Sequence, residues 1–169
     1  YVAEQRVLSF STANRQISAS LGCFEPAMRL ERVRLVDGLA AALHSSFVPK
    51  AILAQFSEHD TQSLVAGNQS QFSLYSALEN AGHEIASASE IMTARLAMTH
   101  EQQVLSLNDP SAVTVVTRQT YSNDERLLEV AEAIYPAERY TYKTTLARHT
   151  TYQVPLRIHK DHKELTKGR

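Results

Sequence analysis

Two arginines, Arg32 and Arg34, stand two residues apart in the segment MRLERVRLV. Residues at i and i+2 of a β-strand share one face of the sheet, so both guanidinium groups would point the same way. A guanidinium group donates paired hydrogen bonds to a carboxylate or a phosphate, and the pair therefore predicts a site for a small anion. The alternative is a solvated strand face with cross-strand ion pairs. A wholly solvated face, however, would not need the apolar neighbours Met28, Leu30 and Val36.

His44 follows the two arginines at a distance that leaves its side of the sheet open. Asp37-Gly38 is a strong signal for a β-hairpin, and the segment after it is the return strand. A two-residue turn would put His44 on the face opposite the arginines. A three-residue turn with the glycine in the left-handed region would put His44 on their face. The residues alone do not choose between these two turns, and a lone histidine on a strand is more often structural than functional.

Two further pairs of residues are candidates for ligand contacts. Ser73 and Tyr75 stand at the expected start of a helix, where free backbone N–H groups and a hydroxyl favour an anion. The simpler interpretation of Ser73 is that it caps the helix. Glu129 and Tyr135 are six residues apart and share a strand face by parity. Such a pair can hold hydroxyl or amino groups of a ligand, although a single glutamate on a strand is usually solvated.

These side chains need a sheet to hold them, and the hydrophobic periodicity of the chain predicts one. Alternating runs predict strands at 5–12, 28–36, 40–48, 83–94, 112–121, 127–135 and 140–146. Short helices are predicted at 15–22, 50–55, 73–82 and 99–107, with Asn14, Ser73 and Thr99 as N-caps and Gln102 completing a capping box. The polar stretch 58–71 predicts a loop, and 153–169 predicts a poorly ordered tail. Five to seven strands joined by hairpins define an α+β fold with a mainly antiparallel sheet.

Composition and missing motifs exclude several classes of function. The 169 residues carry a net charge of -1, which argues against a nucleic-acid surface on this piece. No dinucleotide, P-loop or GxSxG motif is present, so we expect no cofactor and no catalytic residues. Cys23 is the only cysteine, and its expected role is a buried apolar one in a reducing cytoplasm. His159 and His162 have metal-ligand spacing but lie in the tail, so we expect no metal site.

Three phrases of the sequence, taken in order, resemble a known family. RLERVRLVDGLAAALHSSFVP resembles the hallmark hairpin of the UTRA domain (UbiC transcription regulator-associated) of HutC-type GntR regulators. SLYSALENAGHEIASASEIMTA resembles the helix and strand that follow in that family. VTVVTRQTYSNDERLLEVAEAIYPAERYTY resembles its late strands, with the family's R-x-T-Y phrase. Each phrase alone is degenerate, but their order and spacing over 7–148 are specific.

The resemblance implies a chorismate-lyase-like α+β fold, with a central mainly antiparallel sheet and short helices packed around it. It implies an effector-binding domain at 1–148, a tail at 149–169, and an upstream winged helix-turn-helix that this chain lacks. It further implies a cytoplasmic homodimer whose operator DNA affinity, usually as a repressor, changes when a small anionic metabolite binds. The family's ligand contacts carry over to this set: Arg32, Arg34, His44, Ser73, Tyr75, Glu129 and Tyr135.

Departures from the family pattern limit what the resemblance implies about the ligand. His44 stands where many members have a ligand-contacting glutamate, and the family pattern favours the turn that brings it to the arginines' face. A neutral imidazole can accept a hydrogen bond, whereas a protonated one would add to the hold on an anion. Recognition of an amino sugar is therefore not expected. A lyase of the chorismate type, or a dimerisation module with a vestigial pocket, stays open as an alternative function.

Overall fold

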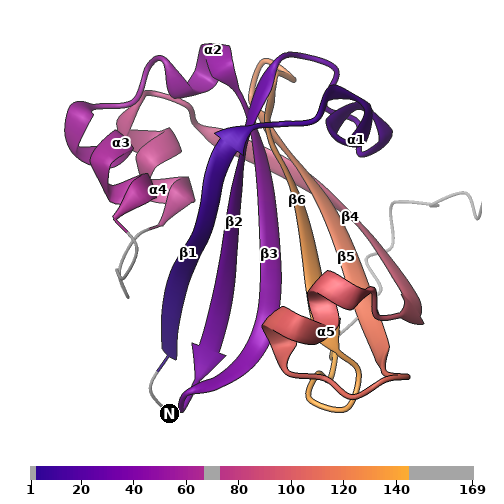
Figure 1. Ribbon diagram of the computed structural model, residues 1–169. Coiled ribbons are helices and arrows are strands. Elements are labelled where there is room, and N and C mark those ends of the chain that lie inside the picture. Colours follow the sequence, from indigo (N-terminus) through magenta and orange to yellow (C-terminus); the bar gives the residue numbers. More distant parts are fainter. Residues whose placement is uncertain (1–2, 67–72, 145–169) are drawn as a thin grey trace, which may run out of the picture.

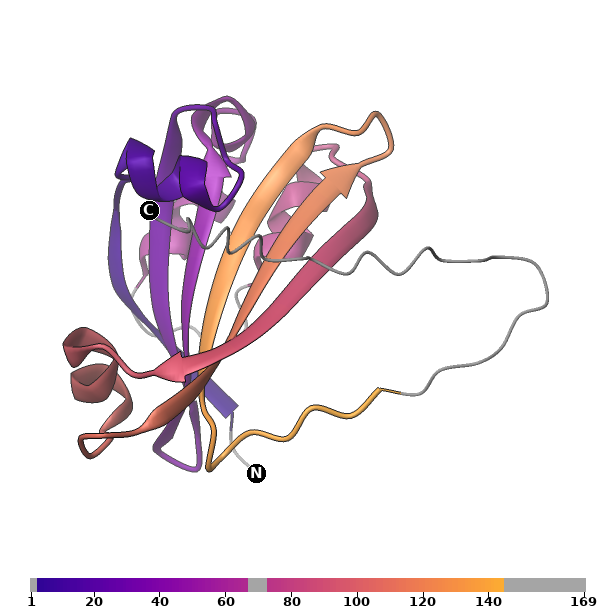
Figure 2. The same ribbon diagram turned by 90° about the vertical axis from the view of Figure 1, so that its right-hand side faces the viewer.

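The computed structural model describes residues 3–66 and 73–144. Six strands form one sheet in the order β1-β2-β3-β6-β5-β4, and every neighbouring pair is antiparallel (Figures 1 and 2). Their bounds are β1 (Ala3–Thr12), β2 (Ala27–Val36), β3 (Leu39–Pro49), β4 (Ile85–Leu96), β5 (Ala112–Ser122) and β6 (Leu127–Pro136). The predicted α+β class with an antiparallel sheet is confirmed.

Short helices cover both faces of this sheet (Figure 1). They are α1 (Arg15–Ser20), α2 (Lys50–Leu53), α3 (Glu58–Val65), α4 (Leu74–Asn80) and α5 (Thr99–Leu105). Helices α3 and α4 lie on one side of the sheet, and α1 and α5 lie on the other (Figure 1). In the described part of the chain, no helix has the length and apolar character needed to cross a membrane.

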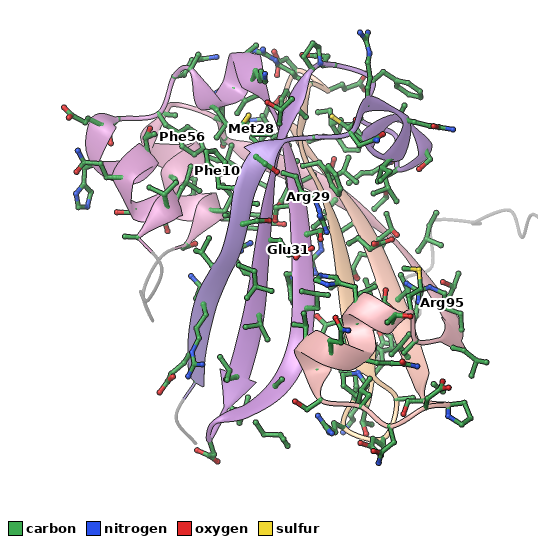
Figure 3. All side chains as sticks on the ribbon, in the orientation of Figure 1. Phe10, Met28, Arg29, Glu31, Phe56 and Arg95 are labelled. Carbon is green, nitrogen blue, oxygen red and sulfur yellow. The ribbon has the colours of Figure 1, made fainter. Side chains whose placement is uncertain are left out.

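Each face of the sheet has its own apolar core. On the α3–α4 side, Leu30 and Val48 pack with Leu64 and Leu78 of the helices. On the α5 side, the buried residues include Val33, Leu43, Leu105, Val113 and Ile134. Figure 3 shows Phe10 and Phe56 pointing into the layer between β1 and the helices on its left. A cavity lies beside the core on the α3–α4 side, and Leu74 and Tyr75 of α4 are in its lining.

The hairpin between β2 and β3 settles the side of the sheet on which His44 lies. Asp37 and Gly38 both have positive φ, 50° and 78°, so the turn has two residues. Yet Arg34 pairs with Ala42 and the next pair is Leu35 with Ala40, so one residue of β3 bulges out. A two-residue turn without a bulge would put His44 on the face opposite Arg32. The extra residue shifts all later pairs of β3 by one position and brings His44 to the face of Arg32. Arg32 is consequently opposite His44, on the same face.

Two secondary-structure predictions were wrong. The predicted loop at 58–71 contains α3, because Ser57 caps a helix by accepting from the backbone N–H of Asp60 and Leu64 is buried under it. The rest of that range, from residue 67, lies outside the described residues. The predicted strand at 140–146 is not a strand through residue 144. Strand β6, which precedes it, already has β3 and β5 as neighbours, and Tyr140 stacks on Tyr135 instead.

The N-terminus of α5 also differs from the prediction, and the difference can be tested. Met98, not Thr99, is the N-cap residue, and its N–H donates to the Glu101 carboxylate at 2.8 Å. Glu101 is 3% exposed and accepts two hydrogen bonds from Arg95, at 2.7 and 2.6 Å. Gln102, the predicted acceptor, instead donates to Asp109.

We expect Glu101→Ala to lower the free energy of unfolding by about 2 kcal/mol, since it removes a cap and leaves a half-buried guanidinium without its partner. Thr99→Ala should change it by less than about 0.5 kcal/mol. Urea denaturation of the two variants makes the comparison. Equal effects of the two substitutions would mean that Thr99 is the cap after all.

Candidate anion-binding site

A cavity of about 430 Å³ opens on the α4 side of the sheet. Strands β2, β3, β6, β5 and β4 form its floor and walls, and the start of α4 and residues 140–142 border it. Its lining includes Arg32, Arg34, His44, Ser46, Ser73, Tyr75, Glu90, Arg118, Glu129, Ala131, Ala133, Tyr135 and Tyr140.

Small residues on β6 explain why the sheet is hollow at this point. Ala131 lies between Ser46 of β3 and Arg118 of β5 in the sheet register. Ala133 lies in the next row, between His44 and Val116. The methyl groups of these alanines and the short side chain of Ser46 rise less above the sheet than His44, Val116 and Arg118 around them, so a depression forms along β6.

The two arginines of β2 that line the cavity, Arg32 and Arg34, differ in their surroundings. Arg32 is 6% exposed, and its Nη2 donates to Ser46 Oγ at 3.1 Å. Within the part of the chain that the structure describes, its Nε has no hydrogen-bond partner, and burial lowers the pKa of its guanidinium group. Arg34 is exposed beside it. Among residues 3–66 and 73–144, neither arginine forms an ion pair with a carboxylate.

Glu129 is the buried carboxyl group of the cavity. It is 3% exposed, and this burial raises its pKa, although the hydroxyl of Ser46 and the charge of Arg32 act in the opposite direction. Ser46 thus connects the guanidinium group to the carboxyl group without a direct ion pair. A buried carboxyl group with a raised pKa can donate a hydrogen bond when it is protonated and accept one when it is not.

His44 and the tyrosines form the wall above Ala133. The rings of His44 and Tyr135 meet edge to face with 5.8 Å between their centroids. Tyr135 stacks on Tyr140 with 4.0 Å between the ring centroids. Burial, followed by the charges of Arg34, Arg32 and Arg118, lowers the pKa of His44 to about 3. The imidazole is therefore neutral at physiological pH, so in the free protein it does not add a positive charge to the site.

This neutral histidine predicts a pH dependence of stability. In the unfolded chain His44 titrates near its ordinary pKa of 6.5, so at lower pH the unfolded state takes up the proton first. The titration of His44 therefore leaves the free energy of unfolding at its full value above pH 6.5 and lowers it as the pH decreases towards 3. Between pH 6.5 and 5, the free energy of unfolding of the wild type should fall by about 2 kcal/mol more than that of His44→Gln.

Urea unfolding at both pH values measures this difference. His59→Gln, at an exposed position of α3, is the matched control and should follow the wild type. An identical pH dependence in wild type and His44→Gln would show that His44 titrates normally in the folded protein.

Ser73 and Tyr75 lie at the start of α4, as predicted. Ser73 Oγ accepts from the N–H of Ser76 at 3.3 Å, so its hydroxyl caps the helix. Tyr75 reaches into the cavity, where its hydroxyl lies 3.1 Å from Thr120 Oγ1 and accepts from Arg118 at 3.3 Å. Of the two, Tyr75 is the one whose polar atom belongs to the network in the cavity wall.

All seven residues predicted from the sequence line this one cavity. Whether they contact a ligand stays a prediction. The other polar residues of the lining were not predicted as site residues; they are Ser46, Glu90, Arg118, Tyr140 and Tyr142. A signal for Arg118 existed, because it is the only charged residue in the strand predicted at 112–121.

The other face of the sheet carries polar contacts of a structural kind. Glu31 is bound by Arg29, and its other oxygen lies 3.1 Å from Nε2 of His100 on α5. Figure 3 shows Arg29 and Glu31 along the middle of the sheet and Arg95 beside α5. In the described part of the chain, no group of His, Cys, Asp or Glu side chains could hold a metal ion. Cys23 is buried.

Fold and cavity together define an α+β domain with a cationic pocket on one face of an antiparallel sheet. Known proteins share the fold. The effector domain of PhnF from Mycobacterium smegmatis matches with a TM-score of 0.69 at 20% identity, over 87% of this chain and 88% of that one. The effector-binding domain of the trehalose repressor TreR from Bacillus subtilis matches with a TM-score of 0.69 at 16% identity, over 87% and 99%. At such low identity the likeness establishes the fold.

The sequence comparisons establish the family. The family model of the UTRA domain matches residues 1–141, so the chain belongs to the UTRA family, as the sequence phrases predicted. The HTH-type transcriptional repressor NagR of Bacillus subtilis is 26% identical over 133 residues, which are 77% of this chain and 51% of NagR. The chain thus spans about half the length of this curated relative.

Proposed function

We propose that this UTRA domain binds a small anionic metabolite, phosphorylated or carboxylated, in the cavity over Ala131 and Ala133. The observation that carries the proposal is the burial of Arg32 on the cavity wall, without an ion pair to any carboxylate of residues 3–66 and 73–144. Burial of a cation without a counter-ion is costly, so such a group is usually retained for a function. Arg34 lies beside it and can take a second oxygen of the same anion.

The charges of the cavity support an anionic ligand. Three arginines line it, against the two carboxyl groups of Glu90 and Glu129. Protonation of Glu129 would raise the excess of positive charge further, and its pKa is shifted in that direction. His44 stays neutral and offers a hydrogen bond, so a ligand with hydroxyl groups next to its anionic group fits the lining better than one with an ammonium group.

A domain that only dimerises would be expected to pair both arginines with carboxylates and to lack a cavity. In the described residues the opposite holds, since the cavity is present and neither Arg32 nor Arg34 is ion-paired with a carboxylate. This difference favours ligand binding over a vestigial pocket. The relatives are named as regulators and effector domains, so we propose binding without turnover rather than a lyase reaction.

At the level of the whole protein, we propose that the domain belongs to a cytoplasmic DNA-binding regulator that acts as a homodimer, with the winged helix upstream of residue 1. Binding of the anion would then change the affinity for operator DNA, most simply by releasing a repressor. NagR, of which this chain spans about half, is a transcriptional repressor of the helix-turn-helix type. That likeness is the support for this proposal.

A thermal-shift screen of anionic metabolites and of their neutral parent compounds tests the proposed ligand class. We expect phosphorylated or carboxylated compounds to raise the melting temperature in a saturable way, because a ligand that binds only the folded state stabilises it. The neutral parents should have no effect, and recovered ligands should be chemically unchanged. Stabilisation by neutral sugars alone would contradict an anion site, and release of pyruvate from chorismate would indicate the lyase.

A further inference from the structure

Arg118 is already engaged in the free protein. Its Nε donates to Oε1 of Glu90 at 2.7 Å, and its Nη2 donates to the same oxygen. Its Nη1 donates to the hydroxyl of Tyr75 at 3.3 Å. The hydrogen bonds to Tyr75 and Glu90 raise the pKa of this guanidinium group, which therefore carries a full charge. Both carboxylate-facing nitrogens of Arg118 are thus used by a protein group.

The ion pair of Arg118 and Glu90 lies in the lining of the cavity. Arg118 is directly opposite Glu90 on β4 and, on its other side, directly opposite Ala131 on the cavity floor. The side chains of Arg118 and Glu90 are 44% and 36% exposed, and both line the cavity. An ion pair as exposed as this one stabilises a protein only weakly, so another anion can replace the carboxylate at little cost.

The Arg118–Glu90 pair lies across the cavity floor from Arg32 and Arg34 of β2. Arg118 is on β5, three strands away from β2 in the sheet order, which corresponds to about 14 Å between the backbones. The side chains of all three arginines line the same cavity, and their charges all lower the pKa of His44, which lies on β3 between β2 and β5 in the sheet order. An anionic ligand that lies on the floor therefore meets Arg32 and Arg34 on one side and the Arg118–Glu90 pair on the other.

We propose that Glu90 is an internal counter-ion of Arg118 that an anionic ligand must displace. In the free protein Glu90 occupies the third guanidinium group of the cavity, and in the complex the ligand takes its place. This inference rests on the proposed function. Glu90 then determines how strongly an anion must bind before it can displace the carboxylate from Arg118. A weak or singly charged anion competes poorly with a carboxylate that is already in place.

The test is a double-mutant cycle on the affinity for inorganic phosphate, measured by isothermal titration calorimetry at constant ionic strength. We expect Glu90→Gln to tighten binding about 3- to 10-fold, by removing the competitor and its negative charge. Arg118→Gln should weaken binding. In the Arg118→Gln background, Glu90→Gln should change the dissociation constant less than about twofold, because the competition is gone.

Glu4→Gln, an exposed change of the same charge on β1, is the control for net charge and should leave the affinity unchanged. Unchanged or weaker binding by Glu90→Gln would overturn the inference. The inference would also fall if Glu90→Gln tightened phosphate binding by the same factor in the Arg118→Gln background. The effect would then come only from repulsion between Glu90 and the phosphate. If Arg32→Met weakens phosphate binding by about tenfold or more while Glu90→Gln has no effect, the proposed function stands and this inference falls. Absence of saturable phosphate binding in every variant would overturn both.

Discussion

Replacing Arg32 by methionine is expected to weaken the binding of the anionic ligand by about 10- to 150-fold, which corresponds to one charge-assisted contact of about 1.5–3 kcal/mol. Arg32 is the buried member of the arginine pair, and its position is fixed by Ser46 at 3.1 Å. A fixed donor on a cavity wall binds a ligand with little loss of side-chain freedom. Calorimetric titration of the wild type and the variant measures the effect.

The same substitution should leave the stability unchanged or increase it. Arg32 is buried, and among the described residues its Nε has no hydrogen-bond partner, so the folded state already bears the cost of removing this charge from water. Methionine fills similar space without that cost. Arg6→Met, on the exposed edge of β1, removes the same charge away from the cavity and should bind like the wild type. A large loss of stability in Arg32→Met would mean that Arg32 is structural.

Replacing Ala131 by leucine is expected to weaken ligand binding at least about a hundredfold, or about 2.7 kcal/mol. The added atoms would stand on the cavity floor, between Ser46 and Arg118, in the space that the ligand needs. The cavity is open, so the side chain does not have to displace packed atoms. We therefore expect the free energy of unfolding to change by less than about 1 kcal/mol.

Ala94→Leu provides the matched control for this change. Ala94 is exposed on β4 and lies outside the cavity lining, so the same atoms added there should not alter the affinity. Binding and urea unfolding are measured on both variants. Undiminished binding by Ala131→Leu would place the ligand elsewhere on the molecule.

The arginine pair shows how much of the site the sequence could predict. Alternation along 28–36 was enough to put Arg32 and Arg34 on one face, because the side-chain period of a strand is fixed at two. The side of His44 could not be read in this way. It depends on a bulge at Ala41, where a single extra residue of β3 reverses the parity that the turn alone would give.

Other parts of the site depend on long-range pairing that no local pattern contains. Arg118 was visible as a lone charge in a β-branched strand, but its place in the cavity follows from β5 lying beside β6 rather than beside β2. The hollow over Ala131 and Ala133 likewise appears only when their taller neighbours on β3 and β5 are known. Helix α3 was missed because its few apolar residues give weak periodicity, and its burial comes from packing against β1.

The most direct test of the anion site is a crystal structure of the domain grown with the anion that stabilises it most in the thermal-shift screen. We predict density for its anionic group within about 2.7–3.2 Å of the guanidinium nitrogens of both Arg32 and Arg34, above Ala131. An anion bound on the α5 side of the sheet, with the cavity unoccupied at saturating concentration, would contradict the central claim.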